Sequence, residues 1–212
     1  MLANFKPFIE IGGQVNYNDC RKVMIMEIPY GSTMLQLNLP VSWQVDWIAP
    51  PVLGNFQPAA SLIEAALENE IDANLSALAA RAKSAAIAIN DKTRPVPNDL
   101  LLPPLLARLE SAGIKPENIT LLVATGSHLP MKPREFPLIL PHEILARYPV
   151  VSHDCDDEHR LTYCGRTSSG TEVWANSLYQ AADLRIVCGN LEPHHFMGYS
   201  GGVKSAAIGL TG

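Results

Sequence analysis

From residue 59 onward the chain alternates between short apolar runs and stretches with helical spacing, and this alternation constrains the fold most strongly. Short, mainly apolar runs bounded by polar residues are typical of buried strands. Strands that alternate with helices predict a largely parallel sheet flanked by helices, an α/β fold. The apolar runs are 85–89, 119–124 and 184–188, and the helical stretches are 60–67, 75–83 and 98–109.

Shorter signals fill the rest of this region. Asn98 is expected to cap the helix that follows it, and Gly113 to end that helix. Pro103 and Pro104 disfavour the first turns of the same helix. The remaining predictions are a helix from 141, a strand at 150–152, a hairpin between 161 and 174 turned at 168–170, a helix at 177–182 and a helix start beside Lys204.

The first 58 residues follow a different pattern. The runs 23–29 and 34–40 flank a Tyr-Gly-Ser turn, and the second run alternates between apolar and polar residues. This pattern predicts a β-hairpin, followed by a proline-rich connector. We therefore expect an N-terminal β-hairpin layer over residues 1–58, packed on an α/β domain over 59–212 and carrying no chemistry of its own.

Charge and cysteine content limit the partners and the compartment. The 212 residues carry a formal net charge of −5 without any block of lysine or arginine, which argues against nucleic acids and anionic membranes as partners. The four cysteines are scattered without a C-x-x-C spacing, which indicates free thiols. No apolar run reaches the ~18 residues of a membrane span. We expect a soluble, cytoplasmic protein.

Three of the predicted strands end in polar clusters. These clusters lie at 90–94, 125–128 and 190–195. In an open α/β sheet, ligands bind beyond the carboxyl ends of the strands. If these strands are neighbours, one cleft would contain the four side chains of Arg94, His128, His194 and Lys204.

These residue types suit a defined chemistry. A guanidinium such as that of Arg94 binds a carboxylate through two hydrogen bonds, and Asp91 could orient it. Imidazoles at 128 and 194 could exchange protons near neutral pH, and Lys204 is a candidate nucleophile or covalent tether. Plainer readings stay open: Arg94 could pair with Asp91 on a surface loop, His128 could satisfy loop carbonyls, and Lys204 could be solvated. Of the adjacent histidines 194 and 195, one is expected to point away.

Two other motifs are weaker. Residues 198–205 approach a phosphate-binding loop, but Val203 occupies the place of its second glycine, so only a looser phosphate contact at the Gly-Gly pair stays open. Residues 153–159 contain possible metal ligands, but their spacing favours a solvated acidic loop.

Four separated motifs are residues 91–95 (DKTRP), 124–128 (ATGSH), 153–154 (HD) and 192–204 (EPH…SGGVK). In this order they resemble the motifs of the nickel-pincer lactate racemase family, and the hairpin turn at 29–31 is similar as well. The resemblance covers nearly the whole chain. The resemblance implies a racemase or epimerase that removes a hydride from a 2-hydroxy acid and returns it to either face.

The resemblance also implies roles for individual positions. Lys204 would hold the nickel-pincer nucleotide covalently, and His128 and His194 would be the acid/base pair. Arg94 and Asp91 would bind substrate. Cofactor-biosynthesis proteins would be partners. Other residues that match cofactor-binding motif positions are Thr125, Ser200, Gly201 and Gly202.

The chain also departs from the family pattern. Leu129 and Val203 stand where the lactate-specific branch has cations, which leaves open a 2-hydroxy acid other than lactate. The family's nickel-ligand histidine would lie beyond Gly212, as would its second domain. We therefore expect a truncated N-terminal domain that is inactive in isolation and lacks the cofactor as produced. A cofactor carrier module and an imine-forming lysine enzyme stay open as alternatives.

Overall fold

A computed structural model describes residues 16–18, 23–46 and 57–212. The chain divides into two compact units, Met1–Phe56 and Gln57–Gly212. Each unit is described by itself. Within the described residues, no helix combines the length and apolar character needed to cross a membrane.

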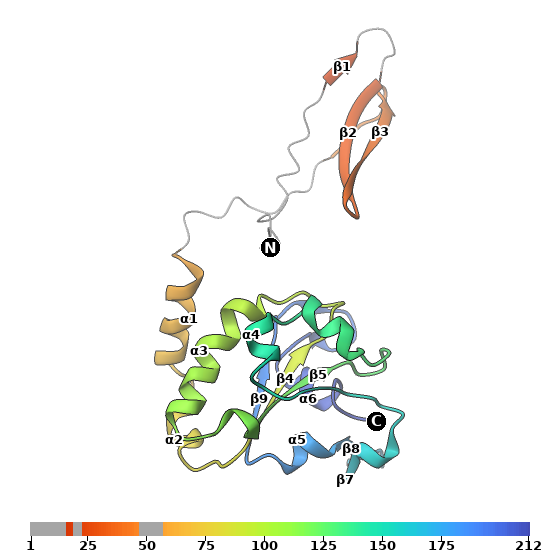
Figure 1. The fold of residues 1–212 in the computed structure, drawn as a ribbon. Coiled ribbons are helices and arrows are strands. Elements are labelled where there is room, and N and C mark those ends of the chain that lie inside the picture. The colour runs from red at the N-terminus through yellow and green to blue at the C-terminus, as the bar shows by residue number, and fades with distance from the viewer. Residues whose placement is uncertain (1–15, 19–22, 47–56) are drawn as a thin grey trace. The chain divides into compact units, whose positions relative to one another are not determined.

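The N-terminal unit contains an antiparallel three-stranded sheet in the order β1-β2-β3 (Figure 1). Tyr30 pairs with Thr33, so the turn between β2 and β3 has two residues, and its Gly31 adopts a positive φ of 59°. Two-residue hairpin turns require such left-handed residues, which glycine supplies without steric cost. The predicted hairpin is confirmed, whereas its packing on the α/β domain stays a prediction. The strands are β1 (Asn16–Asn18), β2 (Val23–Tyr30) and β3 (Thr33–Pro40).

The second unit is built on a four-stranded parallel sheet in the order β6-β5-β4-β9 (Figure 1). The chain adds β5 and β6 on one side of β4 and then returns to add β9 on the other side. This confirms the largely parallel α/β fold. The strands are β4 (Ala85–Asn90), β5 (Ile119–Ala124), β6 (Val150–Ser152) and β9 (Leu184–Cys188).

Both faces of this sheet are buried, as its apolar strands require. Alternate residues of β4 belong to different cores. Ile87 and Ile89 pack on the side of helix α3 (Asn98–Ser111), and Ala86 and Ala88 pack on the side that holds Tyr179 and Leu210. Small side chains at 86 and 88 let the chain that follows β9 lie close to the sheet.

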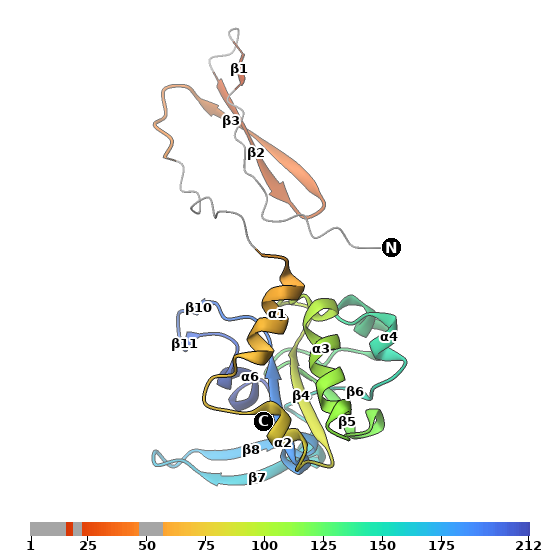
Figure 2. The same cartoon turned by 90° about the vertical axis from the view of Figure 1, so that its left-hand side faces the viewer.

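Helices cover the sheet, with α1 and α3 side by side on one face (Figure 2). Helices α5 and α6 contact β4 on the opposite face, where Tyr179 and Leu210 pack against the sheet. The second helix is shorter than the predicted 75–83, and the others lie close to their predicted positions. The helices are α1 (Ala59–Glu68), α2 (Leu75–Ala79), α3 (Asn98–Ser111), α4 (His142–Leu145), α5 (Ser177–Ala181) and α6 (Val203–Ala207).

The predicted cap of α3 is wrong. Asn98 is the first helical residue, preceded by Pro97, and its buried amide donates to the carbonyl of Ile139 across the domain. Burial against a distant loop therefore outweighs local capping. Pro103 and Pro104 lie inside this helix. They lack N–H groups for the carbonyls of Asp99 and Leu100, two exposed residues whose carbonyls can turn to water instead.

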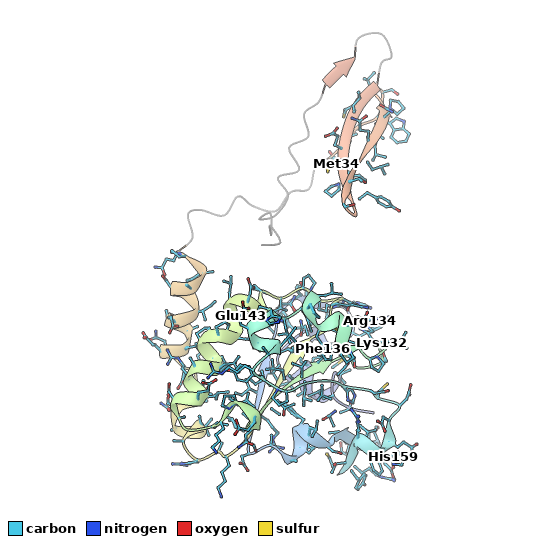
Figure 3. The ribbon with its side chains drawn as sticks, in the orientation of Figure 1. Met34, Lys132, Arg134, Phe136, Glu143 and His159 are labelled. Atoms are coloured by element: carbon cyan, nitrogen blue, oxygen red, sulfur yellow. The ribbon has the colours of Figure 1, made fainter. Side chains whose placement is uncertain are left out.

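The remaining elements are peripheral. Phe136 reaches the core from η2, while Lys132 and Arg134 of the same segment lie at the surface (Figure 3). The β7–β8 hairpin and the β10–β11 hairpin lie at opposite ends of the unit (Figure 2). These elements are η1 (Pro116–Asn118), η2 (Pro133–Leu138), η3 (Glu158–Arg160), β7 (Leu161–Arg166), β8 (Glu172–Asn176), β10 (Pro193–His194) and β11 (Gly198–Tyr199).

Candidate active site

The three polar clusters meet because β4, β5 and β9 end in register. Asn90 pairs with Ala124, and Ile89 with Cys188, so the residues that follow leave the sheet at the same edge. A pocket of about 200 Å³ opens there. The chain continues from β4 to β5 on one side of the sheet and later adds β9 on the other side. Such a switch point in strand order is the usual position of a ligand in these sheets. The lining of the pocket includes Arg94, His128, His194 and Lys204, together with Asp91, Thr125, Ser200 and Gly201.

Asp91 is a buried carboxylate at the centre of this edge. Its Oδ1 accepts hydrogen bonds from the backbone N–H and the hydroxyl of Thr93, at 2.8 and 2.6 Å. Its Oδ2 lies 2.7 Å from Nδ1 of His128. Burial acts to raise the pKa of Asp91, but the hydrogen bonds from Thr93 and His128 outweigh it and hold the pKa below its usual value. The carboxylate therefore stays charged beside the imidazole.

This arrangement corrects two readings of the sequence. Asp91 orients His128 rather than the guanidinium of Arg94, which donates to the carbonyl of Thr93. His128 bonds to a carboxylate rather than to loop carbonyls, and half of its side chain is exposed toward the pocket. Arg94 is exposed and keeps most of its donors for a ligand.

His194 enters the pocket from the β10–β11 hairpin. The backbone N–H groups of Phe196 and Met197 donate to its Nδ1, at 3.2 and 3.3 Å. Desolvation, followed by the electrostatic effects of Lys204, His195 and Arg94, lowers the pKa of His194. The imidazole is therefore neutral near neutral pH.

His195 is not on the lining of the first pocket, as expected of one of these adjacent histidines, but its ring lies against that of His194. The two rings stack with centroids 5.0 Å apart and planes 5° from parallel. His195 lines a second pocket of about 350 Å³, which shares Arg94, His194 and Ser200 with the first.

A glycine turn delivers Lys204 to the pocket. Gly201 has φ of +70°, and a Cβ there would collide with the carbonyl oxygen of Asn190. Helix α6 starts immediately afterwards and places the half-buried Lys204 on the lining. The backbone N–H groups of Lys204 and Ser205 already donate to the carbonyls of Gly201 and Gly202, so the looser phosphate contact considered from the sequence lacks these donors.

The other residues expected to bind the cofactor are Thr125, Ser200 and Gly202, and each has a local structural contact. Thr125 is buried, and its hydroxyl donates to the carbonyl of His153 at 2.8 Å. The hydroxyl of Ser200 contacts the backbone of Glu192 and so closes the hairpin. Gly202 has φ of +51° and serves the turn; it is not on the lining of the first pocket.

Two asparagines on the lining had no role in the sequence reading. The amide of Asn90 donates to Oδ1 of Asn190 at 2.7 Å and so joins the ends of β4 and β9. Close packing leaves no room for a side chain at Gly189, where a Cβ would lie 2.8 Å from Oδ1 of Asn90. Both asparagines begin the polar clusters at 90–94 and 190–195, and this position after an apolar run is the signal that could have found them.

The segment that follows β6, residues 153–159, begins with a buried histidine and ends at the surface. His153 is fully buried: its Nε2 lies 3.1 Å from the carbonyl oxygen of Thr211, and its Nδ1 lies 3.2 Å from the amide of Asn176. His159, at the far end of the segment, lies beside the β7–β8 hairpin (Figure 3). Among the described residues, no group of three or more histidine, cysteine or acidic side chains could hold a metal.

Fold and pocket together define a class: an α/β domain with a pocket at the switch point of a parallel sheet, lined by a lysine, an arginine and two imidazoles. Sequence comparison then identifies the family. Residues 30–212 match the family model described as the lactate racemase N-terminal domain, and the chain belongs to this family. The resemblance stated from the motifs is thereby confirmed.

Two lactate racemases show how far the similarity extends. The protein from Thermoanaerobacterium thermosaccharolyticum is 33% identical over 190 residues, covering 88% of this chain and 44% of the relative. The protein from Lactiplantibacillus plantarum is 35% identical over 151 residues, covering 70% of this chain and 35% of the relative. The chain thus spans less than half the length of these relatives.

Solved structures support the fold. The lactate racemase apoprotein from T. thermosaccharolyticum superposes with a TM-score of 0.71 at 32% identity, covering 88% of this chain and 44% of that one. A Thermotoga maritima protein superposes with a TM-score of 0.53 at 21% identity over 65% of this chain and 38% of that one, a likeness of fold alone.

Proposed function

We propose that this chain is the N-terminal domain of a nickel-pincer-dependent racemase or epimerase of a 2-hydroxy acid. One observation carries the proposal: Arg94, His128, His194 and Lys204 line a single pocket in a chain of the lactate racemase family. These residues supply a carboxylate-binding cation, two imidazoles and an amine. We place the protein in the cytoplasm, in line with the free thiols of Cys155, Cys164 and Cys188 in the described part of the chain.

The residues present fit the proposed cofactor. The glycine turn before α6 lets Lys204 reach the pocket, and the position that would bring a Cβ into collision with Asn190 is occupied by Gly201. A lysine amine is the group required for a covalent amide or thioamide tether. Thr125 and Ser200 line the same space. Cofactor-biosynthesis proteins would supply the nucleotide.

When bound, the nucleotide would supply the acceptor for the hydride of the substrate carbon. The chain's own residues bind and orient the substrate. Arg94 would hold the substrate carboxylate through its free guanidinium donors. His128, oriented by Asp91, and His194 face the same pocket and are the proposed groups that contact the 2-hydroxyl.

The substrate need not be lactate. Leu129 and Val203 are exposed apolar residues beside His128 and Lys204, where the lactate-specific branch has cations. The second candidate function is a non-catalytic module of the same family that binds or carries the cofactor. Both candidates require Lys204 as the tether, whereas only the first requires proton transfer.

Interconversion of 2-hydroxy acid enantiomers tests the proposal directly. The full natural polypeptide, co-produced with cofactor-biosynthesis proteins, is incubated with a panel of single enantiomers and followed by chiral chromatography. We expect interconversion of at least one acid, reduced about 10²-fold or more in His128→Ala, as for a lost general base. Cofactor loading without interconversion of any acid would favour the carrier module. An imine-forming enzyme would instead be trapped on Lys204 by borohydride.

A further inference from the structure

His153 belongs to the one motif that the proposed function leaves without a role, residues 153–154. Its side chain is fully buried and is not on the lining of either pocket at the sheet edge. Burying an imidazole costs free energy unless its nitrogens are hydrogen-bonded. The partners of the ring therefore show what this residue holds in place.

The donors and acceptors around the ring form one consistent set. Oδ1 of Asn176 accepts from the backbone N–H groups of Leu178 and Tyr179, at 3.1 and 3.2 Å. The amide nitrogen Nδ2 of Asn176 therefore faces His153, and it donates to Nδ1 at 3.2 Å. Because Nδ1 is the acceptor of this neutral ring, Nε2 carries the proton and donates to the carbonyl of Thr211 at 3.1 Å.

Thr211 closes the turn that follows α6. Its hydroxyl donates to the carbonyls of Ala207, the last residue of α6, and Ile208, at 3.1 and 3.4 Å. The backbone N–H groups of Ile208 and Gly209 donate to the carbonyl of Lys204, at 2.9 and 3.1 Å. A shift of Thr211 therefore moves the helical turn that carries Lys204.

The main chain of His153 holds the other side of the pocket. Its carbonyl accepts from the hydroxyl of Thr125 at 2.8 Å, and its N–H donates to the carbonyl of Val123 at 3.0 Å. The carbonyl of Thr125 in turn accepts from the backbone N–H of His128, at 3.0 Å. One buried residue thus contacts both the turn that carries His128 and the tail of the helix that carries Lys204.

We propose that His153 is a positioning residue that sets the distance between Lys204 and His128 across the pocket. It acts through Thr211 on the side of the lysine and through Thr125 on the side of the imidazole. Its effect on turnover rests on the proposed function, whereas its effect on the geometry of the pocket does not.

Two further hydrogen bonds limit the size of the shift. The carbonyl of Gly209 accepts from the N–H of Gly126 at 3.0 Å, and that of Leu210 from the N–H of Asn176 at 2.8 Å. Both bonds join main-chain groups and form with any residue at 153. Loss of the imidazole should therefore displace the tail of α6 without releasing it.

Two amide variants separate the contacts of the ring. The amide nitrogen of a glutamine lies near the position of the imidazole Nε2, so His153→Gln keeps a donor for the carbonyl of Thr211. An asparagine is shorter and places its amide oxygen near the position of Nδ1. His153→Asn therefore keeps the contact with Asn176 and loses the contact with Thr211.

Amide ¹⁵N–¹H spectra of the labelled 212-residue chain measure the displacement without cofactor. We expect His153→Asn to shift the signals of Lys204 and Ser205, and His153→Gln to leave them close to their positions in the unmodified chain. Thr125→Val removes the hydroxyl that donates to His153 and should shift the signal of His128. This variant tests the second half of the link independently of how well the variants at 153 fold, and an unchanged His128 signal would overturn the proposal.

Tyr148→Phe controls for general destabilisation. Tyr148 precedes β6, at the opposite edge of the sheet from the pocket, and its hydroxyl donates to Glu110. Loss of that hydrogen bond should lower the melting temperature and leave the signal of Lys204 in place. A Lys204 signal that does not move in His153→Asn, or that moves equally in Tyr148→Phe, would overturn the proposal.

Kinetics of the loaded, full natural polypeptide test the consequence for turnover. A displaced Lys204 misaligns the cofactor but not Arg94, so His153→Asn should lower kcat about 10-fold or more and change KM less than about 3-fold. His153→Gln should keep kcat within about 3-fold of the unmodified enzyme. Equal losses of kcat in the two variants would refute the positioning role. Absence of turnover in the unmodified enzyme would count against the proposed function, and the spectra would still decide the role of His153.

Discussion

At the scale of single residues, the partners of the polar groups matter more than their presence. The sequence places Asp91 three positions before Arg94, and that spacing suggests a local pair. The structure instead joins Asp91 to His128 across 37 positions, because the ends of β4 and β5 lie side by side. Which residues gather at the sheet edge could be predicted; which of them bond to each other depends on loop geometry that has no periodic signal.

Asp91→Asn should destabilise the protein in a pH-dependent way. The pKa of Asp91 is lower in the folded state than its reference value of 3.8, so its stabilising contribution is present above that value and is lost as the pH falls through the folded pKa. We expect a loss of about 1–3 kcal/mol at pH 7, shrinking below pH 4. Urea unfolding between pH 3 and 7 measures it, and a difference that does not vary with pH would contradict this account.

His153→Gln should flatten the dependence of stability on pH between about 5 and 7. Burial lowers the pKa of His153, so the unfolded chain binds a proton more readily than the folded one. The unfolding free energy therefore falls as the pH drops below about 6.5, by up to about 1.4 kcal/mol per pH unit. Thermal or urea unfolding across this range should show the slope reduced in the variant.

The exposed His159 provides the control for that experiment. His159→Gln removes a histidine from the surface and should leave the slope close to that of the unmodified chain. Equal slopes in the unmodified chain and His153→Gln would contradict the role assigned to the buried imidazole.

At the scale of elements, the strands were predictable and some of the helix ends were not. The run at 119–124 coincides with β5, because an apolar segment of that length has few alternatives to a buried strand. The start of α3 differs because Asn98 bonds to the distant Ile139 instead of capping. The turn before α6 was recognisable from its glycines, although the reason for Gly201, its approach to Asn190, requires the structure.

Gly201→Ala should disturb the pocket more than Gly198→Ala. Both residues have positive φ, but a Cβ at 201 would collide with the carbonyl of Asn190, whereas nothing lies within 4 Å of one at 198. We expect a clearly larger fall in melting temperature for Gly201→Ala, with ¹⁵N chemical shift changes at 190 and 204. Equal destabilisation by the two variants would show that backbone strain alone, and not the close approach, sets the cost.

At the scale of the whole molecule, the alternation of strands and helices was enough to predict an α/β sheet and the edge of that sheet at which the pocket lies. Neither the order β6-β5-β4-β9 nor the small core around Ala86 and Ala88 follows from periodicity. Strand order depends on how the connections cross, and periodicity describes each strand only by itself.

We expect the 212-residue chain alone to interconvert no 2-hydroxy acid, even when loaded with cofactor. It spans only 44% of the length of the T. thermosaccharolyticum lactate racemase. Chiral chromatography compares it with the full natural polypeptide at equal concentration. Turnover by the chain at a rate close to that of the full polypeptide would contradict this expectation.

The central claim is that Lys204 tethers a nickel-pincer nucleotide at the edge of the sheet. Intact mass spectrometry of the full natural polypeptide, co-produced with the cofactor-biosynthesis proteins, tests it most directly. We predict a nickel-bearing mass increment that is absent from Lys204→Ala. The control variant Lys132→Ala, which changes the exposed lysine just before η2, should retain the increment. An unmodified mass, or an increment that persists in Lys204→Ala, would contradict the claim.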